Sequence, residues 1–99
     1  MNIKTSKYAN ELMVTLEGRL DTVTAPELEK ALGAELDLCD SLVFDFEKLS
    51  YISSAGLRVL LSSQKKMNGR KGTMVIRHVN ELIVEIFETT GFMDVFTVE

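Results

Sequence analysis

The stretch from Val43 to Leu57 constrains the fold of this chain most, because an apolar run, a short turn and a helix start follow one another there. Only Asp45 interrupts the apolar run Leu42–Phe46, and such continuity is typical of a central parallel strand that is buried on both faces. Ser53 and Ser54 then open an apolar helix. A buried strand that leads directly into a helix predicts a sheet with helices packed on it.

Further strands and helices are expected on both sides of this stretch. Residues 3–8 and 12–17 predict two antiparallel strands joined by a tight turn, because apolar and polar residues alternate in the second. A helix is expected to begin at Thr24, which can form a capping box with Glu27 around Pro26, and to end near residues 38–40.

The second half of the chain predicts a helix over residues 54–69, a strand over 73–79 and a third helix that Asn80 caps and Gly91 ends. Residues 92–98 either add a last short strand or cover the core. The predicted order β-β-α-β-α-β-α(-β) indicates an α/β fold, a mixed sheet of four to five strands in a single domain over residues 1–99.

Charge argues against binding to nucleic acid. The chain carries 15 acidic and 11 basic residues, a net charge of −4, whereas nucleic-acid affinity rests mainly on cations that neutralise phosphates. The one basic cluster, Lys65-Lys66 with Arg70-Lys71, lies at a predicted helix end, where cations also complement the helix dipole. The expected partner is therefore another protein.

No membrane insertion and no secretion are expected. The longest apolar runs are a few residues long, and the N-terminus has no apolar signal region. Cys39 is the only cysteine and cannot form an internal disulfide, which favours the cytoplasm. Cys39 and His78 have no matching ligand set, so neither a metal site nor a cofactor is expected.

Motifs for catalysis are also missing around Ser54. No Gly-Lys-Ser/Thr follows a glycine-rich run, so the turn is not a phosphate-binding loop of a nucleotide enzyme. A nucleophile elbow needs glycine two residues before and after the serine, and Ile52 takes the first of these positions. His78, the only histidine, follows the next strand and leaves Ser54 without an obvious base. We therefore expect a protein that is not an enzyme.

A hydroxyl at the start of a helix has two interpretations. Ser53 or Ser54 can simply cap the helix, as serine commonly does. Alternatively, Ser54 lies on the surface at the positive end of the helix, a position suited to a group that gains or loses a phosphate. The small residues Ala55 and Gly56 favour the second interpretation, because they would let another molecule approach the backbone.

One pattern in the chain combines Asp45-Phe46, Leu49, Tyr51-Ile52 and Ser53-Ser54-Ala55-Gly56-Leu57. This pattern resembles the STAS domains, the family of bacterial anti-sigma-factor antagonists and of a related domain of sulphate transporters. The resemblance extends to segments near both ends of the chain: Gly18-Arg19-Leu20-Asp21, Thr24-Ala25, Leu28, Glu88-Thr89-Thr90-Gly91-Phe92 and Phe96.

The resemblance implies a regulatory function rather than catalysis. In partner switching, the unphosphorylated antagonist binds a serine kinase that is also the anti-sigma factor, and this binding frees a sigma factor. The kinase then phosphorylates a serine of an Asp-Ser-Ser/Thr-Gly motif and releases the antagonist, which a PP2C-type phosphatase resets. That serine corresponds to Ser54, with Ser53 as second choice, since Ser53 stands where the motif has aspartate and Ala55 takes its third position.

A partner-binding surface is expected around Ser54, and it comprises Asp21, Thr22, Thr24, Ser53, Ala55, Gly56, Arg58 and Val59. For Asp21 a role as turn former, and for Arg58 a role as solvated helix residue, remain open. Asp45 either binds the amides of the turn and holds Ser54 in place, which we favour, or emerges at the strand end. The family also allows another function, that of an accessory subunit attached to the ATPase of a lipid transporter.

Overall fold

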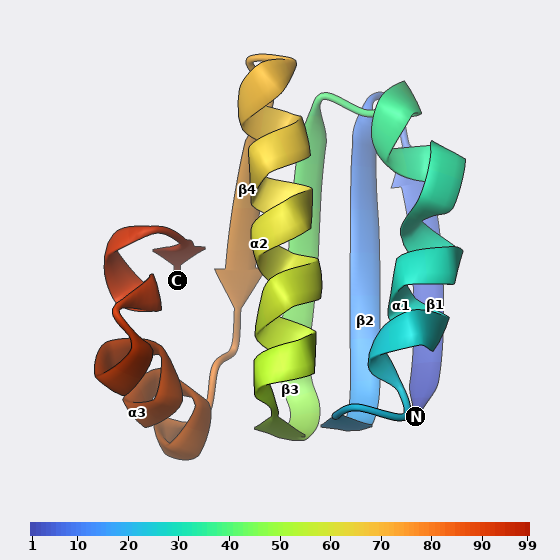
Figure 1. Ribbon diagram of the computed structural model, residues 1–99. Helices are drawn as coiled ribbons and strands as arrows, with labels where there is room; N and C mark the ends of the chain where they lie inside the picture. The colour runs from blue at the N-terminus through green and yellow to red at the C-terminus, as the bar shows by residue number, and fades with distance from the viewer.

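Five strands form one mixed sheet in the computed structural model, which describes residues 1–99 (Figure 1). The strands are β1 (Asn2–Tyr8), β2 (Glu11–Leu20), β3 (Ser41–Ile52), β4 (Thr73–Arg77) and β5 (Thr97–Val98). They lie in the order β1-β2-β3-β4-β5, with β1 antiparallel to β2 and all other neighbours parallel. The predicted mixed sheet is confirmed, and residues 92–98 do add a fifth strand.

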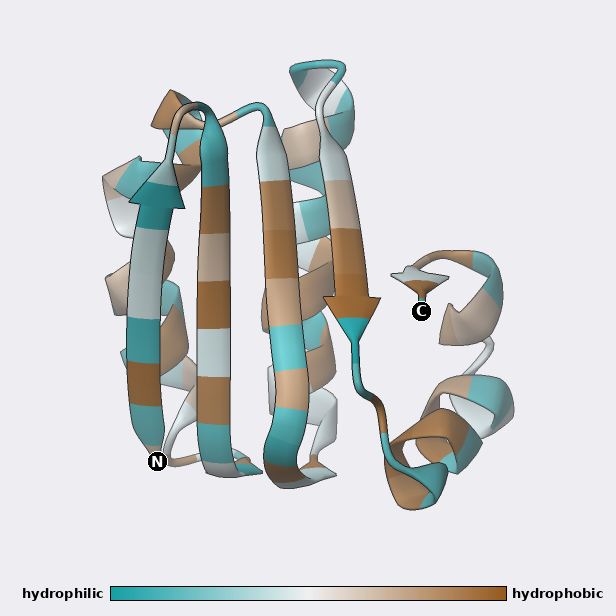
Figure 2. Ribbon diagram, turned by 180° about the vertical axis from the view of Figure 1, so that it is seen from behind, coloured by the Kyte–Doolittle hydropathy of each residue, from teal (hydrophilic) through white to brown (hydrophobic).

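The helices lie mainly on one face of this sheet. They are α1 (Ala25–Leu32), α2 (Ser54–Gly69) and α3 (Glu81–Thr90), with short 3-10 turns η1 (Gly33–Leu38) and η2 (Phe92–Asp94). Helices α1 and α2 run side by side over the strands, whereas α3 lies beyond β4 (Figure 1). Seen from behind, the strands have no element in front of them (Figure 2). None of the helices combines the length and the apolar content that crossing a membrane requires.

The core lies between the sheet and the helices α1 and α2. Strands β2 and β3 send alternate side chains to this side, which is the period expected of a strand with one buried face. The fully buried residues on this side include Leu12, Val14, Leu16, Leu42, Phe44, Phe46, Leu28 and Leu60. This alternation confirms the pattern that predicted the second strand.

Strand β3 differs from its prediction in two ways. It continues to Ile52 rather than ending in a turn after Phe46, because Glu17–Leu20 of β2 keeps pairing with it. It is also not covered on both faces: Asp45 points to the uncovered face, where Val43 is shielded by its register neighbours Met13 and Val75. An apolar run can therefore be buried laterally by neighbouring strands without a second helical layer.

The ends of the elements follow local rules that the sequence predicted only in part. Asn80 caps α3 through a hydrogen bond that its Oδ1 accepts from the Ile83 N–H (2.9 Å), and Gly91 ends α3 with φ +81°, as expected. Helix α1 stops earlier than predicted, at Leu32, because Gly33 has φ +26° and starts a 3-10 turn. Strand β4 ends at Arg77 rather than at residue 79.

Candidate functional site

Ser53 is the N-cap of α2. Its backbone is extended (φ −99°, ψ 175°), and its Oγ accepts a hydrogen bond from the Gly56 N–H at 3.4 Å. Its own N–H donates to the Leu20 carbonyl at 2.8 Å, which ties the start of α2 to the end of β2. The hydroxyl of Ser53 is thus engaged in a hydrogen bond. This half-buried residue caps the helix, a role that the sequence allowed for either serine.

Ser54 is the first residue of α2, and it is exposed. The side-chain hydrogen bonds of the structure include none to its hydroxyl, in contrast to Ser53. The first backbone N–H groups of a helix have no intrahelical acceptor, and the helix dipole makes this end positive. Ser54 therefore presents a free hydroxyl at a place where a phosphate would be well accommodated.

Gly56 is buried, and its lack of a side chain serves the packing of α2. A Cβ at this position would lie 2.7 Å from Leu20 Cγ and 2.9 Å from Ile52 Cγ1, closer than side-chain carbons approach each other. The first turn of α2 can therefore rest on the ends of β2 and β3 only if this residue is glycine. Internal packing thus explains the glycine that the sequence assigned to the approach of a partner, whereas Ala55 stays half-exposed.

The loop Asp21–Thr24 is held by its own hydrogen bonds. Asp21 Oδ1 accepts from the N–H groups of Val23 and Thr24, each at 3.0 Å, and Thr24 Oγ1 accepts from the Asp21 N–H at 2.8 Å. Asp21 is thus a turn former, one of its two predicted roles. The predicted capping box is wrong, because the Thr24 side chain makes no capping bond to α1 and donates to the Arg19 carbonyl (2.8 Å) instead.

A groove between α1 and α2 joins this loop to the start of α2. It has a volume of about 350 Å³ and is lined by Thr22, Ala25, Pro26, Glu29, Ala55, Arg58, Val59 and Ser62. The structure thus gathers four of the predicted partner-binding residues, Thr22, Ala55, Arg58 and Val59, in one concave surface beside Ser54. Asp21, Thr24, Ser53 and Gly56 do not line the groove but support the backbone around it.

We predict that Asp21 makes the stability of the protein depend on pH on the acid side. The backbone N–H of Thr24 and the other groups that the carboxylate binds hold the pKa of Asp21 below its usual value of 3.8. A carboxyl whose pKa is lowered by folding stabilises the folded state at any pH above its pKa in the unfolded state. This stabilisation is lost as the pH falls through the pKa of the folded state. In urea unfolding, the difference between wild type and Asp21→Asn should therefore be constant near neutral pH and shrink below about pH 4. A difference that grows towards low pH would contradict this assignment.

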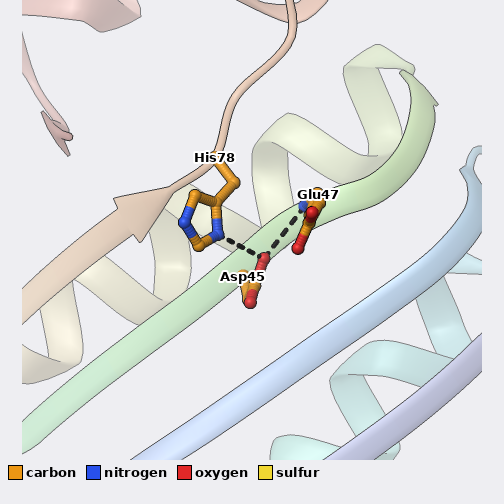
Figure 3. Close-up of side chains that lie close together, drawn as sticks. All are labelled: Asp45, Glu47 and His78. Carbon is orange, nitrogen blue, oxygen red and sulfur yellow. Dashed lines mark hydrogen bonds and ion pairs between the residues drawn. The ribbon is translucent and has the colours of Figure 1, made fainter.

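Asp45 does not hold Ser54, so the favoured prediction for this residue is wrong. Its Oδ1 lies 3.0 Å from His78 Nδ1 and accepts a hydrogen bond from the Glu47 N–H at 3.0 Å (Figure 3). It does not emerge at the strand end either, because β3 continues for seven residues to Ile52. Burial would raise the pKa of Asp45, but the bonds from Glu47 and His78 outweigh it and lower that pKa, and the same contact raises the pKa of His78.

The family follows from comparison with known proteins. The model of the STAS domain matches residues 2–99. The chain belongs to the STAS domain family. BtrV of Bordetella bronchiseptica, which is provisionally named an anti-sigma factor antagonist, is 34% identical over 99 residues, covering 99% of this chain and 85% of BtrV. The anti-sigma-B factor antagonist of Staphylococcus aureus strain NCTC 8325 is 31% identical over 99% of this chain and 92% of its own length.

A solved structure agrees with this STAS assignment. The crystal structure of an anti-sigma factor antagonist from Mycobacterium paratuberculosis matches with a TM-score of 0.88 and 26% identity, over 98% of this chain and 83% of that one. The expected STAS-like mixed sheet and its element order are confirmed.

The sequence interpretation missed the cluster of Asp45, Glu47 and His78. Asp45 and Glu47 are neighbours on β3, but His78 lies 33 residues after Asp45 along the chain. The strand register brings His78 to them: Asp45 pairs with Arg77, so that His78 is the next residue beyond the paired end of β4. The sequence predicted a central parallel strand at residues 42–46 and a further strand at 73–79, but neither their pairing nor its register. A register search with the single histidine as its starting point could have found this cluster.

Proposed function

We propose that this STAS domain is an anti-sigma-factor antagonist that works by partner switching in the cytoplasm. In its unphosphorylated form it binds an anti-sigma-factor serine kinase and so frees a sigma factor. Phosphorylation of Ser54 by that kinase releases it, and a PP2C-type phosphatase restores the binding form. In this proposal the chain acts as a binding protein and not as an enzyme.

The observation that carries this proposal is the difference between the two adjacent serines. Ser53 is engaged as the cap of α2, whereas Ser54 is exposed, its hydroxyl makes no hydrogen bond within the domain, and its neighbour Ala55 lines the groove between α1 and α2. The named function of relatives that are 31% and 34% identical over nearly the whole chain supports the same proposal.

The groove gives the switch a physical basis. A phosphate on Ser54 adds about −1.5 to −2 charges and strong acceptor oxygens next to Ala55, which lines the groove. The free N–H groups of α2 and its dipole stabilise this charge within the domain, so the fold is kept. A bound partner, in contrast, must desolvate or accommodate the new charge, and the penalty therefore falls on the complex.

The test is phosphorylation by the kinase that the protein recovers in a pull-down. We expect one phosphate on the wild type and on Ser53→Ala when the protein is incubated with this kinase and ATP, and none on Ser54→Ala. Intact-mass analysis gives the count. Label that persists in Ser54→Ala and vanishes in Ser53→Ala would refute the site. Recovery of a transporter ATPase without any kinase would refute the antagonist function and favour the accessory-subunit function.

A further inference from the structure

Three side chains with metal-ligating atoms meet on the sheet, outside the groove at α2. Asp45 and Glu47 come from β3, and His78 comes from the segment that follows β4 (Figure 3). One ligand atom from each lies within 4.8 Å of the other two. Neither the switch at Ser54 nor the packing of the core uses this cluster.

Two local features of the backbone bring these residues together. His78 has φ +59°, a left-handed conformation that is uncommon for residues other than glycine, at the point where the chain leaves β4. Strand β3 carries a bulge, since Thr15 pairs with Asp45 but Glu17 pairs with Lys48, and so two residues of β3 stand opposite one residue of β2. The Asp45 carboxylate binds the Glu47 N–H within this bulge.

The donor set suits a borderline divalent transition-metal ion. Imidazole nitrogen and carboxylate oxygen bind Zn²⁺ at about 2.0–2.2 Å, and sites with three protein ligands keep a fourth position for water. Ligand atoms of a tetrahedral site with such bonds are about 3.3 Å apart. Asp45 Oδ1 and His78 Nδ1 are 3.0 Å apart, so this pair already has nearly the required spacing.

Glu47 is the ligand that has to move. It is exposed, and its carboxylate takes part in none of the ion pairs of the structure. A rotation of this flexible side chain therefore costs little and can close the largest separation in the cluster. His78, with 58% of its side chain exposed, leaves room for the ion and its water.

Nearby cations set the balance of charge around the cluster. The guanidinium of Arg77 is engaged by Glu99, with Nε 3.1 Å from Oε1. Lys4 and Lys48 line a pocket of about 70 Å³ together with Asn2, Thr15, Glu17, Asp45 and Glu47. Three carboxylates thus face two lysines there, which leaves a net negative surface that attracts a cation.

We propose that Asp45, Glu47 and His78 form a surface site for a divalent transition-metal ion such as Zn²⁺, with water as a further ligand. The sequence predicted no metal site because His78 had no visible ligand partners along the chain. The fold supplies two of them. This site is independent of the antagonist function and of Ser54.

Zinc titration of the protein without an affinity tag tests the proposal. Calorimetry should detect one equivalent of Zn²⁺, and the ring signals of the imidazole should shift in NMR spectra. Because His78 is the only histidine, these signals need no further assignment. His78→Asn and Glu47→Gln should each weaken binding by about tenfold or more, as loss of metal-supporting groups does elsewhere. Asparagine tolerates the left-handed backbone, so His78→Asn should keep the fold.

Glu85→Gln provides the matched control, because Glu85 is exposed in α3 and lies outside the cluster. It should bind Zn²⁺ like the wild type. The proposal fails if wild type binds no zinc. It also fails if His78→Asn and Glu47→Gln bind as tightly as wild type, which would place the ion elsewhere, for example on Cys39.

Discussion

Replacing Ser54 with glutamate is expected to weaken binding to the partner kinase about a hundredfold. The new carboxylate lies beside the groove between α1 and α2, where a docked partner would have to remove its water. Burying a charge against a partner that does not pair with it costs about 3 kcal/mol, and ~1.4 kcal/mol corresponds to a factor of ten in Kd. Calorimetric titration of the kinase recovered by pull-down measures this change.

Ser54→Gln is the matched control for the glutamate variant. Glutamine has nearly the same shape as glutamate but no charge, so this variant isolates the effect of volume. We expect it to bind much more tightly than Ser54→Glu. Equal weakening by both variants would assign the effect to steric exclusion, and unchanged binding of Ser54→Glu would remove Ser54 from the interface.

The same variant should leave the domain intact. An acidic side chain in the first turn of a helix interacts favourably with the dipole and with the free N–H groups. The free energy of unfolding of Ser54→Glu should therefore equal or slightly exceed that of the wild type. A switch of this kind acts at the surface, and amide-shift mapping that showed a rearranged sheet would contradict it.

The fold could be predicted because its signals are local. The apolar run before Asp45, the alternation around Val14 and the caps at Asn80 and Gly91 each determine one element by short-range chemistry. The length of β3 could not be predicted in this way. Residues 47–52 look polar and turn-like, and only pairing with β2 through a bulge keeps them extended.

The position of the site could be predicted from the sequence, but the separate roles of its residues could not. Spacing alone identified two serines at a helix start, and the structure separates the engaged Ser53 from the free Ser54. Asp45 was assigned to the wrong partner, because its true neighbour His78 is 33 residues away along the chain. Such contacts depend on strand register, which neither periodicity nor residue type encodes.

Gly56→Ala is expected to destabilise the domain by about 1–2 kcal/mol, although alanine is the better helix former. Its Cβ would lie within 2.7–2.9 Å of Leu20 and Ile52, and both side chains are fully buried and cannot move aside. Overpacking of this kind costs about 1–3 kcal/mol, whereas the gain in helix propensity is at most about 1 kcal/mol. Urea unfolding measures the net loss.

Gly69→Ala is the control that separates the effect of packing on stability from the effect of helix propensity. Gly69 lies in the same helix, and no atom would meet its Cβ within 4 Å. This variant should be as stable as the wild type or more stable by up to ~1 kcal/mol. If Gly56→Ala instead behaves like Gly69→Ala, the first turn of α2 does not rest on β2 and β3 as described. If the two diverge as expected, glycine at position 56 is required to seat α2, and with it the exposed hydroxyl of Ser54, against the sheet.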